Sequence, residues 1–246
     1  MMKIFGVVEY NGTKYQGWQK QVGAKTIQHE MEKVISKVLN TPTVVFGSGR
    51  TDAGVHALAQ TFHFSTEKEH LDLNLLMHSF NCLLPEDIQI ISLQFVNKDF
   101  HARLSAKAKI YEYRIHIGKT SVFSYDFEEE VFLPFDKELF KQALALFIGE
   151  HNFQNFTSKE DDDDDFVREI YSIRVITDEK NIRVEFKGDG FMRYEIRYLI
   201  GTAIAVAKGQ IGLDFIKTRL DPVDKERKIV SYKAASKGLF LKEVIY

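Results

Sequence analysis

Apolar and polar positions in the first hundred residues follow the spacings of strands and helices in turn. β-Branched and aromatic residues at 3–10 predict a strand that stops at the turn dipeptide Asn11-Gly12. Thr26 is a suitable N-cap for a helix, because the apolar residues after it recur at the spacing of one helical face. The other elements predicted in this half are strands at 43–49 and 59–64, a helix at 71–84 ended by Pro85, and a strand at 88–95.

The second half repeats this alternation. Residues 109–117 predict a strand with Tyr111, Tyr113 and Ile115 on one face. Asp136 is the expected N-cap of a helix that Gly149 ends. Hairpins in place of strict βαβ alternation predict an α+β fold with a largely antiparallel, mixed sheet, flanking helices and two similar halves joined near 98–103. The remaining predictions are a hairpin at 171–188, a helix at 191–209, a last strand at 238–246, and halves at 1–100 and 101–246.

Composition indicates a folded globular protein. The chain has 246 residues, 44% of them hydrophobic and 13% aromatic, and only 4 prolines. We expect a cytoplasmic protein, because apolar stretches are too short to span a bilayer and Glu9 comes too early for a signal peptide. The single cysteine, Cys82, argues against a zinc-finger site and is expected to pack as a small hydrophobic residue.

The formal charge hides an uneven distribution. The net charge of −2 includes a run of six acids, Glu160 to Asp165, without which 29 acidic residues face 33 Lys and Arg. Such a dense run repels itself, so we interpret it as an exposed insertion and not as a metal site. The rest of the chain is mildly basic, which suits a nucleic-acid ligand.

The most informative carboxylate is Asp52. Small residues surround it, Gly47 and Gly49 before it and Ala53 and Gly54 after it, which allow a sharp turn and the close approach of a ligand. The carboxylate can serve as nucleophile or general base, whereas a metal site would need further acids nearby. An Asx-turn, in which Asp52 only accepts backbone N–H bonds, explains the same residues. Local spacing leaves both interpretations open.

Motifs along the rest of the chain help to choose between these two interpretations of Asp52. The segment GRTDAGVHA at 49–57 resembles the signature of the TruA family of tRNA pseudouridine synthases. Six further blocks are similar to that family's, in the family's order, and they cover nearly the whole chain: 10–21, 81–90, 99–115, 146–156, 191–201 and 238–246. The resemblance implies the pseudouridine synthase fold and an isomerase that converts uridine to pseudouridine in tRNA without a cofactor or metal. It also implies a homodimer that acts on uridines 38, 39 and 40 of the anticodon stem-loop.

The resemblance also implies roles for individual residues. Asp52 matches the family's aspartate, which attacks C1′ of the ribose or C6 of the base, or assists elimination. Arg197 matches an arginine that pairs with this carboxylate and keeps it charged. Tyr111 matches a tyrosine that stacks on the target base, and Arg50 an arginine that holds the nucleotide out of its loop. The strand with Leu239 and Leu241 resembles one that lines the pocket.

Each role has an ordinary structural alternative. Tyr111 and the two leucines fit a core equally well, Arg197 a solvated helix face, and Arg50 a salt bridge within the turn. Three other residues are expected to pack or form hydrogen bonds: Tyr113, His56 and His63. The candidate contacts to the RNA backbone are Lys14, Lys20, Lys107 and Lys109, each of which also fits a solvated lysine.

The chain departs from the family pattern in places that concern RNA binding. Glu195-Ile196-Arg197 stands where many members have Met-Val-Arg, the approach to the last strand at 229–240 is unusual, and the acidic run falls in a loop that lies near RNA in relatives. A non-catalytic RNA-binding module is the main alternative function, but it would have no need of Asp52, Tyr111 and Arg197 together. An aspartate-based phosphotransferase would need magnesium and further acids beside Asp52.

Overall fold

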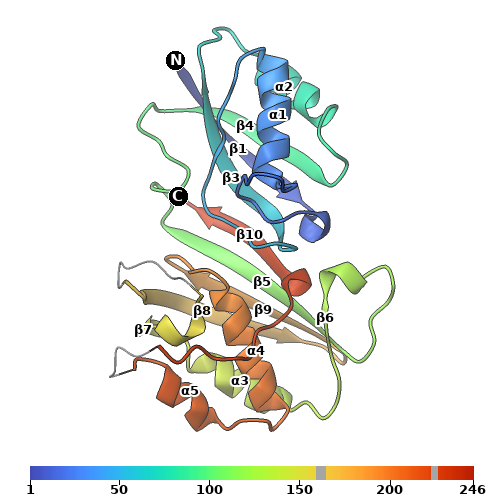
Figure 1. Ribbon diagram of the computed structural model, residues 1–246, viewed down its shortest axis with the longest axis vertical. Helices are drawn as coiled ribbons and strands as arrows, with labels where there is room; N and C mark the ends of the chain where they lie inside the picture. Colours follow the sequence, from blue (N-terminus) through green and yellow to red (C-terminus); the bar gives the residue numbers. More distant parts are fainter. Residues whose placement is uncertain (159–164, 223–226) are drawn as a thin grey trace. The chain divides into compact units, whose positions relative to one another are not determined.

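The computed structural model describes residues 1–158, 165–222 and 227–246, which divide into two compact units (Figure 1). Unit 1 comprises Met1–Lys107 and Phe240–Tyr246, and unit 2 comprises Ala108–Leu239. The sequence pattern placed the join near 100 and kept the last strand with the second half. In the structure most of that strand, β10 (Leu239–Ile245), belongs to unit 1, because Phe240 and Leu241 pair with β3 (His56–Thr66).

Unit 1 is built on an antiparallel sheet completed by one parallel strand. Its strand order is β4-β1-β3-β10, with the two-residue β2 paired to β3. The pair β3–β10 is parallel, and the pairs β1–β3 and β1–β4 are antiparallel. The other elements of unit 1 are β1 (Met2–Tyr10), β2 (Phe46–Gly47), β4 (Ile88–Val96), α1 (Ile27–Leu39), α2 (Leu73–Asn81) and the 3-10 helix η1 (Gly12–Lys14).

The helices of unit 1 form where the pattern predicted them, with differences in detail, and α2 ends at Asn81, well before Pro85. Thr26 is the N-cap of α1, but its side chain makes no capping hydrogen bond, and Asn40 ends the helix in a left-handed conformation. Asp72 caps α2 by accepting from the N–H groups of the next turn. Cys82 was predicted to be buried, which is wrong: it is the exposed C-cap of α2, with Sγ 3.5 Å from His78 Nε2.

The strand predicted at 43–49 is reduced to β2. The N–H groups of Thr43 and Val45 donate to side chains of α1, Ser36 Oγ at 2.8 Å and Glu32 Oε1 at 3.2 Å. Because these backbone donors are satisfied by helix side chains, the segment before β2 does not join a strand ladder.

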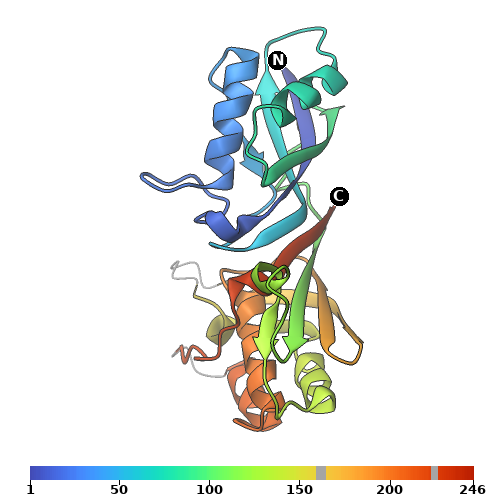
Figure 2. The same ribbon diagram turned by 90° about the vertical axis from the view of Figure 1, so that its right-hand side faces the viewer.

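Unit 2 repeats the combination of an antiparallel sheet and helices. Its strands run β5-β9-β8-β7, with β6 parallel to β5, and the hairpin predicted at 171–188 is formed by β8 and β9 (Figure 2). The elements are β5 (Ala108–Ile117), β6 (Glu129–Val131), β7 (Gly149–Asn152), β8 (Val167–Thr177), β9 (Asn181–Gly188), α3 (Lys137–Ala145), α4 (Glu195–Ala207), α5 (Leu213–Arg219), η2 (Tyr125–Phe127), η3 (Gln154–Phe156) and η4 (Ser236–Gly238). The mixed, largely antiparallel α+β class is confirmed.

The predicted N-cap and strand of unit 2 are confirmed, but α3 ends at Ala145 and not at Gly149, which begins β7. Tyr111, Tyr113 and Ile115 are all buried on β5, and Asp136 caps α3 through the N–H groups of Glu138 and Leu139. Helix α4, however, begins at Glu195 and not at 191, since the residues before it form a turn. The acidic run from Glu160 to Asp164 lies outside the described residues.

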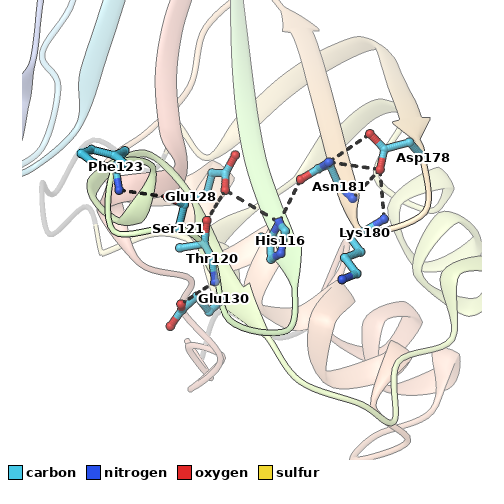
Figure 3. A network of polar contacts seen from close by, with 9 residues as sticks. All are labelled: His116, Thr120, Ser121, Phe123, Glu128, Glu130, Asp178, Lys180 and Asn181. Carbon is cyan, nitrogen blue, oxygen red and sulfur yellow. Dashed lines mark hydrogen bonds and ion pairs between the residues drawn. The ribbon is translucent and has the colours of Figure 1, made fainter.

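A polar network fixes the connection between β5 and β6 (Figure 3). Thr120 donates its N–H to Glu130 Oε1 at 2.9 Å and its hydroxyl to Glu128 Oε2 at 2.7 Å. His116 Nδ1 lies 2.9 Å from Asn181 Oδ1 and 3.9 Å from Glu128 Oε2, so it links this connection to β9. The network involves none of the predicted site residues.

Candidate active site

Asp52 lies on a short turn between β2 and β3 in unit 1. The N–H of Val55 donates to the Asp52 carbonyl at 3.1 Å, and Gly54 adopts a φ of 75°. A positive φ at the third position of a turn is suited to glycine, which accounts for one of the small residues beside Asp52. The Asp52 side chain is partly exposed at this turn, and Arg50, in the same loop, is exposed. The structure therefore brings these two predicted site residues together.

The segment that follows β1 holds the Asp52 loop in place through backbone atoms. Trp18 donates its N–H to the Thr51 carbonyl at 3.0 Å, and Gly54 donates its N–H to the Tyr15 carbonyl at 3.2 Å. The hydroxyls of Tyr10 and Thr51 lie 2.8 Å apart, and burial raises the pKa of Tyr10, so its phenol stays neutral. The sequence pattern assigned no role to Tyr10, Tyr15 and Trp18, although they fall within the block 10–21.

Gly17 makes the close approach possible. It adopts a φ of 83°, and a Cβ at this position would lie 2.4 Å from the Thr51 carbonyl oxygen and 3.0 Å from the Asp52 carbonyl carbon. Both values are below ordinary van der Waals contact, so any larger residue would displace the loop. The backbone of Asp52 is thus positioned by a contact that only glycine permits.

The two histidines beside the Asp52 loop serve the packing of unit 1, as predicted. His56 and His63 are 1% and 4% exposed, and their Nδ1 atoms accept the N–H groups of Gly12 and Ala102, both at 3.1 Å. Burial lowers the pKa of His63 to about 4, with further contributions from His101 and Lys3. Among the residues that the structure describes, no group of three His, Cys, Asp or Glu side chains is arranged to hold a metal ion.

Tyr111 lies on β5 in unit 2, directly opposite Phe186 of β9. Its side chain is 8% exposed, and its ring meets Phe191 edge to face, with the ring centroids 5.3 Å apart. Tyr113 is fully buried, and its hydroxyl lies 2.7 Å from Glu129 Oε2 and 2.8 Å from the Ala235 carbonyl. The prediction that Tyr113 belongs to the core is confirmed.

Arg197 lies in the first turn of α4, also in unit 2. Its Nε donates to the Ala234 carbonyl at 2.9 Å, its own carbonyl accepts the Ala234 N–H at 2.9 Å, and its guanidinium lies over the Tyr194 ring. Glu195 is fully buried, with Oε2 accepting the Met192 N–H at 2.7 Å. Burial raises the pKa of Glu195 to about 8, so at neutral pH it adds no negative charge two residues before Arg197.

The remaining predicted residues are divided between the units. Leu241 is fully buried in unit 1, and Leu239 is 5% exposed in unit 2. Of the candidate RNA-binding lysines, Lys20 forms an ion pair with Glu32 at 2.9 Å, while Lys14 and Lys107 are exposed and Lys109 is half-buried. Arg50, Asp52 and Leu241 thus belong to unit 1, and Tyr111, Arg197 and Leu239 to unit 2.

Comparison with known proteins gives a consistent result. A family profile described as tRNA pseudouridine synthase matches residues 7–104 and 143–246. The chain is 36% identical to tRNA pseudouridine synthase A of Lactococcus lactis subsp. cremoris (strain SK11), over 100% of this chain and 98% of that protein. It is 33% identical to tRNA pseudouridine synthase A of Streptococcus uberis, over 100% of this chain and 99% of that protein. It is also 35% identical to tRNA pseudouridine synthase A 1 of Protochlamydia amoebophila, over 97% of this chain and 94% of that protein.

Among solved structures, the similarity is much weaker. A chain described as "Crystal Structure of a Cbf5-Nop10-Gar1 Complex" aligns with 97% of this chain and 58% of its own length, at 12% identity and a TM-score of 0.39. In the described part of the chain, no helix is both long and apolar enough to cross a membrane.

Proposed function

Because the chain belongs to the tRNA pseudouridine synthase family and isomerises uridine to pseudouridine in tRNA, we propose that it does so through the Asp52 carboxylate. The reaction breaks the bond from N1 of uracil to C1′ of the ribose and forms a bond from C5 to C1′. C5 loses a proton, and N1 gains one. Asp52 acts as the nucleophile that holds the ribose or the base between these steps, or assists elimination.

The observation that carries this proposal is the construction of the Asp52 turn. The side chain is partly exposed, while the backbone on both sides is fixed by hydrogen bonds to the segment 15–18. A nucleophile needs this combination, because it must reach the substrate and must also hold one position as bonds form. Gly17 packs against the Thr51 carbonyl oxygen and the Asp52 carbonyl carbon, which helps to keep the turn in one position.

Arg197 is the second part of the proposal. An ion pair between its guanidinium and Asp52 keeps the carboxylate charged when substrate excludes water from the site. Two features of unit 2 support this role. The Nε bond to the Ala234 carbonyl limits the directions in which the guanidinium can point, and burial raises the pKa of Glu195 to about 8, so the carboxyl group two residues before Arg197 is mostly protonated at pH 7.

The other proposed roles concern the target nucleotide. Tyr111 stacks on the extruded uracil or transfers a proton through its hydroxyl, and Leu239 and Leu241 line the pocket for the base. Arg50, exposed in the Asp52 loop, occupies the space that the base leaves and contacts phosphate. Burial of Tyr111 beside Phe191 and exposure of Arg50 fit this division between a base pocket and a backbone contact.

The substrate range is proposed from the family resemblance. The targets are uridines 38, 39 and 40 of the anticodon stem-loop, the active form is a homodimer, and the site of action is the cytoplasm, where tRNA is modified. Mapping pseudouridines in total tRNA from cells with and without the protein tests the range. Loss confined to the anticodon arm supports it, and loss in other arms contradicts it.

Replacement of Asp52 by asparagine tests the mechanism. We expect Asp52→Asn to lose at least about a thousandfold in the rate of isomerisation, measured as release of tritium from C5 of labelled uridine in an unmodified tRNA transcript. The matched control is Asp99→Asn, which removes one exposed carboxylate from the same unit. Activity of the wild-type protein in EDTA excludes the phosphotransferase mechanism, and full activity of Asp52→Asn would refute the proposal. If the wild-type protein binds the transcript but releases no tritium, the result favours the non-catalytic RNA-binding module.

A further inference from the structure

Unit 2 gathers three cationic side chains around one aromatic ring. Lys233 Nζ lies 4.5 Å from the centroid of the Tyr194 ring, and the guanidinium carbons of Arg193 and Arg197 lie 5.0 and 5.1 Å from it. Arg193 also donates from Nη2 to the Tyr194 hydroxyl at 3.3 Å. Cations attract the face of an aromatic ring but repel one another, so the ring holds together charges that would otherwise separate.

The backbone at Tyr194 is held in an unfavourable conformation. Tyr194 has a φ of 61° and a ψ of 3°, the left-handed region that residues with a Cβ rarely adopt, and as the N-cap of α4 it makes no side-chain capping bond. Neither turn geometry nor capping therefore explains a tyrosine at this position. Such strained residues cluster at functional sites, where the position of the side chain is what matters.

Lys233 is held beside this ring by two hydrogen bonds between its neighbour Ala234 and Arg197. The N–H and carbonyl of Ala234 bond to the carbonyl and Nε of Arg197, each at 2.9 Å. Gly201 of α4 lets the same segment pack closely, because a Cβ there would lie 2.6 Å from the Tyr232 carbonyl oxygen. The lysine side chain itself is exposed, and it forms no ion pair with the residues that the structure describes.

From these contacts we propose that Arg193 and Lys233 form a subsite for an RNA phosphate next to the target nucleotide, with Tyr194 as the positioning residue. The inference rests on the proposed function, in which Arg197 serves Asp52. Arg193 and Lys233 are both exposed, and both donate hydrogen bonds suited to phosphate oxygens. Glu195, two residues after Arg193, is buried, and burial raises its pKa to about 8, so it is mostly protonated at pH 7 and offsets little of this charge.

The affinity for tRNA measures the subsite directly. Binding of an unmodified tRNA transcript is titrated against salt in the Asp52→Asn background, where no turnover occurs. We expect Arg193→Gln with Lys233→Gln to raise Kd about tenfold or more and to lower the slope of log K against log[salt] by about one for each cation removed. With Asp52 restored, the loss of affinity raises the enzyme concentration that gives the half-maximal single-turnover rate by a similar factor.

The matched control removes two other exposed cations of unit 2, through Lys180→Gln with Arg183→Gln. An equal loss of affinity in this control, or an unchanged Kd and salt slope in the Arg193 and Lys233 variant, overturns the subsite. Tyr194→Phe keeps the ring and is expected to keep the affinity, whereas Tyr194→Leu loses it. Equal affinity of these two variants, each checked for folding by thermal denaturation, overturns the positioning role of the ring.

The outcomes separate this inference from the proposed function. If Asp52→Asn isomerises uridine at the wild-type rate, the proposed mechanism fails, but the affinity measurement still decides whether Arg193 and Lys233 bind RNA. If Asp52→Asn is inactive and the affinity of the double variant is unchanged, the mechanism stands and the phosphate subsite fails.

Discussion

Replacement of Gly17 by alanine tests how the Asp52 loop is positioned. The new Cβ would lie 2.4 Å from the Thr51 carbonyl oxygen and 3.0 Å from the Asp52 carbonyl carbon, so the loop must move away. Gly17 also has a φ of 83°, a conformation that alanine adopts only at a cost. The substitution is therefore expected to affect both stability and catalysis, although Gly17 carries no reactive group.

The expected loss in the free energy of unfolding has two parts. The left-handed backbone costs about 1–2 kcal/mol for alanine, and insertion of a methyl group into a packed contact costs about 1–3 kcal/mol. Gly23 provides a matched control, because its φ is 74° but no described atom lies within 4 Å of the Cβ that alanine would add. Gly23→Ala should lower the free energy of unfolding only by the backbone cost, about 1–2 kcal/mol. The difference in free energy of unfolding between the two variants therefore measures the contact of Gly17 with the Asp52 loop.

Trp18 gives a convenient measurement of stability. It is the single tryptophan of the chain, it is 2% exposed, and it lies in unit 1 with both glycines, so its fluorescence follows the unfolding of that unit in urea. Single-turnover isomerisation of a tRNA transcript measures the effect on Asp52. We expect a loss of at least about tenfold for Gly17→Ala and less than about twofold for Gly23→Ala. Equal stability and equal activity of the two variants would refute the view that Gly17 positions the loop.

Three further predictions concern buried groups. The pKa of His63 is lowered from 6.5 to about 4, so the unfolded chain takes up this proton at a higher pH than the folded protein, and the free energy of unfolding falls as pH drops through this range. We expect His63→Gln to reduce that fall by about 2–3 kcal/mol, measured by urea titrations at several pH values. The pKa of Glu195 is raised from 4.5 to about 8, so its contribution to stability is present below pH 4.5 and is lost as pH rises towards 8 and above. Glu195→Gln should remove this loss, and an unchanged dependence of stability on pH would contradict the raised pKa. Gly201→Ala should destabilise unit 2 although alanine favours helices by about 1 kcal/mol, because its Cβ would lie 2.6 Å from the Tyr232 carbonyl oxygen; denaturation followed by circular dichroism checks the sign.

The elements that the sequence predicted well are those that carry their own local signals. Helix α3 has both an N-cap at Asp136 and an apolar face, and β5 has apolar residues at alternate positions, Tyr111, Tyr113 and Ile115, all of them buried. The elements that were missed are short: β6 has 3 residues, β7 has 4 and α5 has 7. Segments of this length show too few periods for a pattern to emerge, and pairing with distant strands decides their structure.

The candidate site was predictable only in part. The small residues around Asp52 indicated a turn, and Gly54 takes the positive φ that such a turn needs. The bonds that fix the turn could not be predicted, because the N–H of Trp18 and the carbonyl of Thr51 belong to the backbone and carry no side-chain signal. The burial of Glu195 was likewise hidden, since a glutamate at the start of a helix is normally a solvated residue that interacts with the helix dipole.

Tyr194 links the two proposals for unit 2. Its left-handed backbone ends the preceding turn and lets α4 begin at Glu195, which places Arg197 in the first turn of the helix. Its ring meanwhile contacts Arg193, Arg197 and Lys233. A change at Tyr194 that altered the start of α4 would therefore move Arg197, which is proposed to pair with Asp52, together with the cations proposed to bind phosphate. Because one residue sets both positions, binding of the RNA backbone at Arg193 and Lys233 would also favour the placement of Arg197 that the reaction requires.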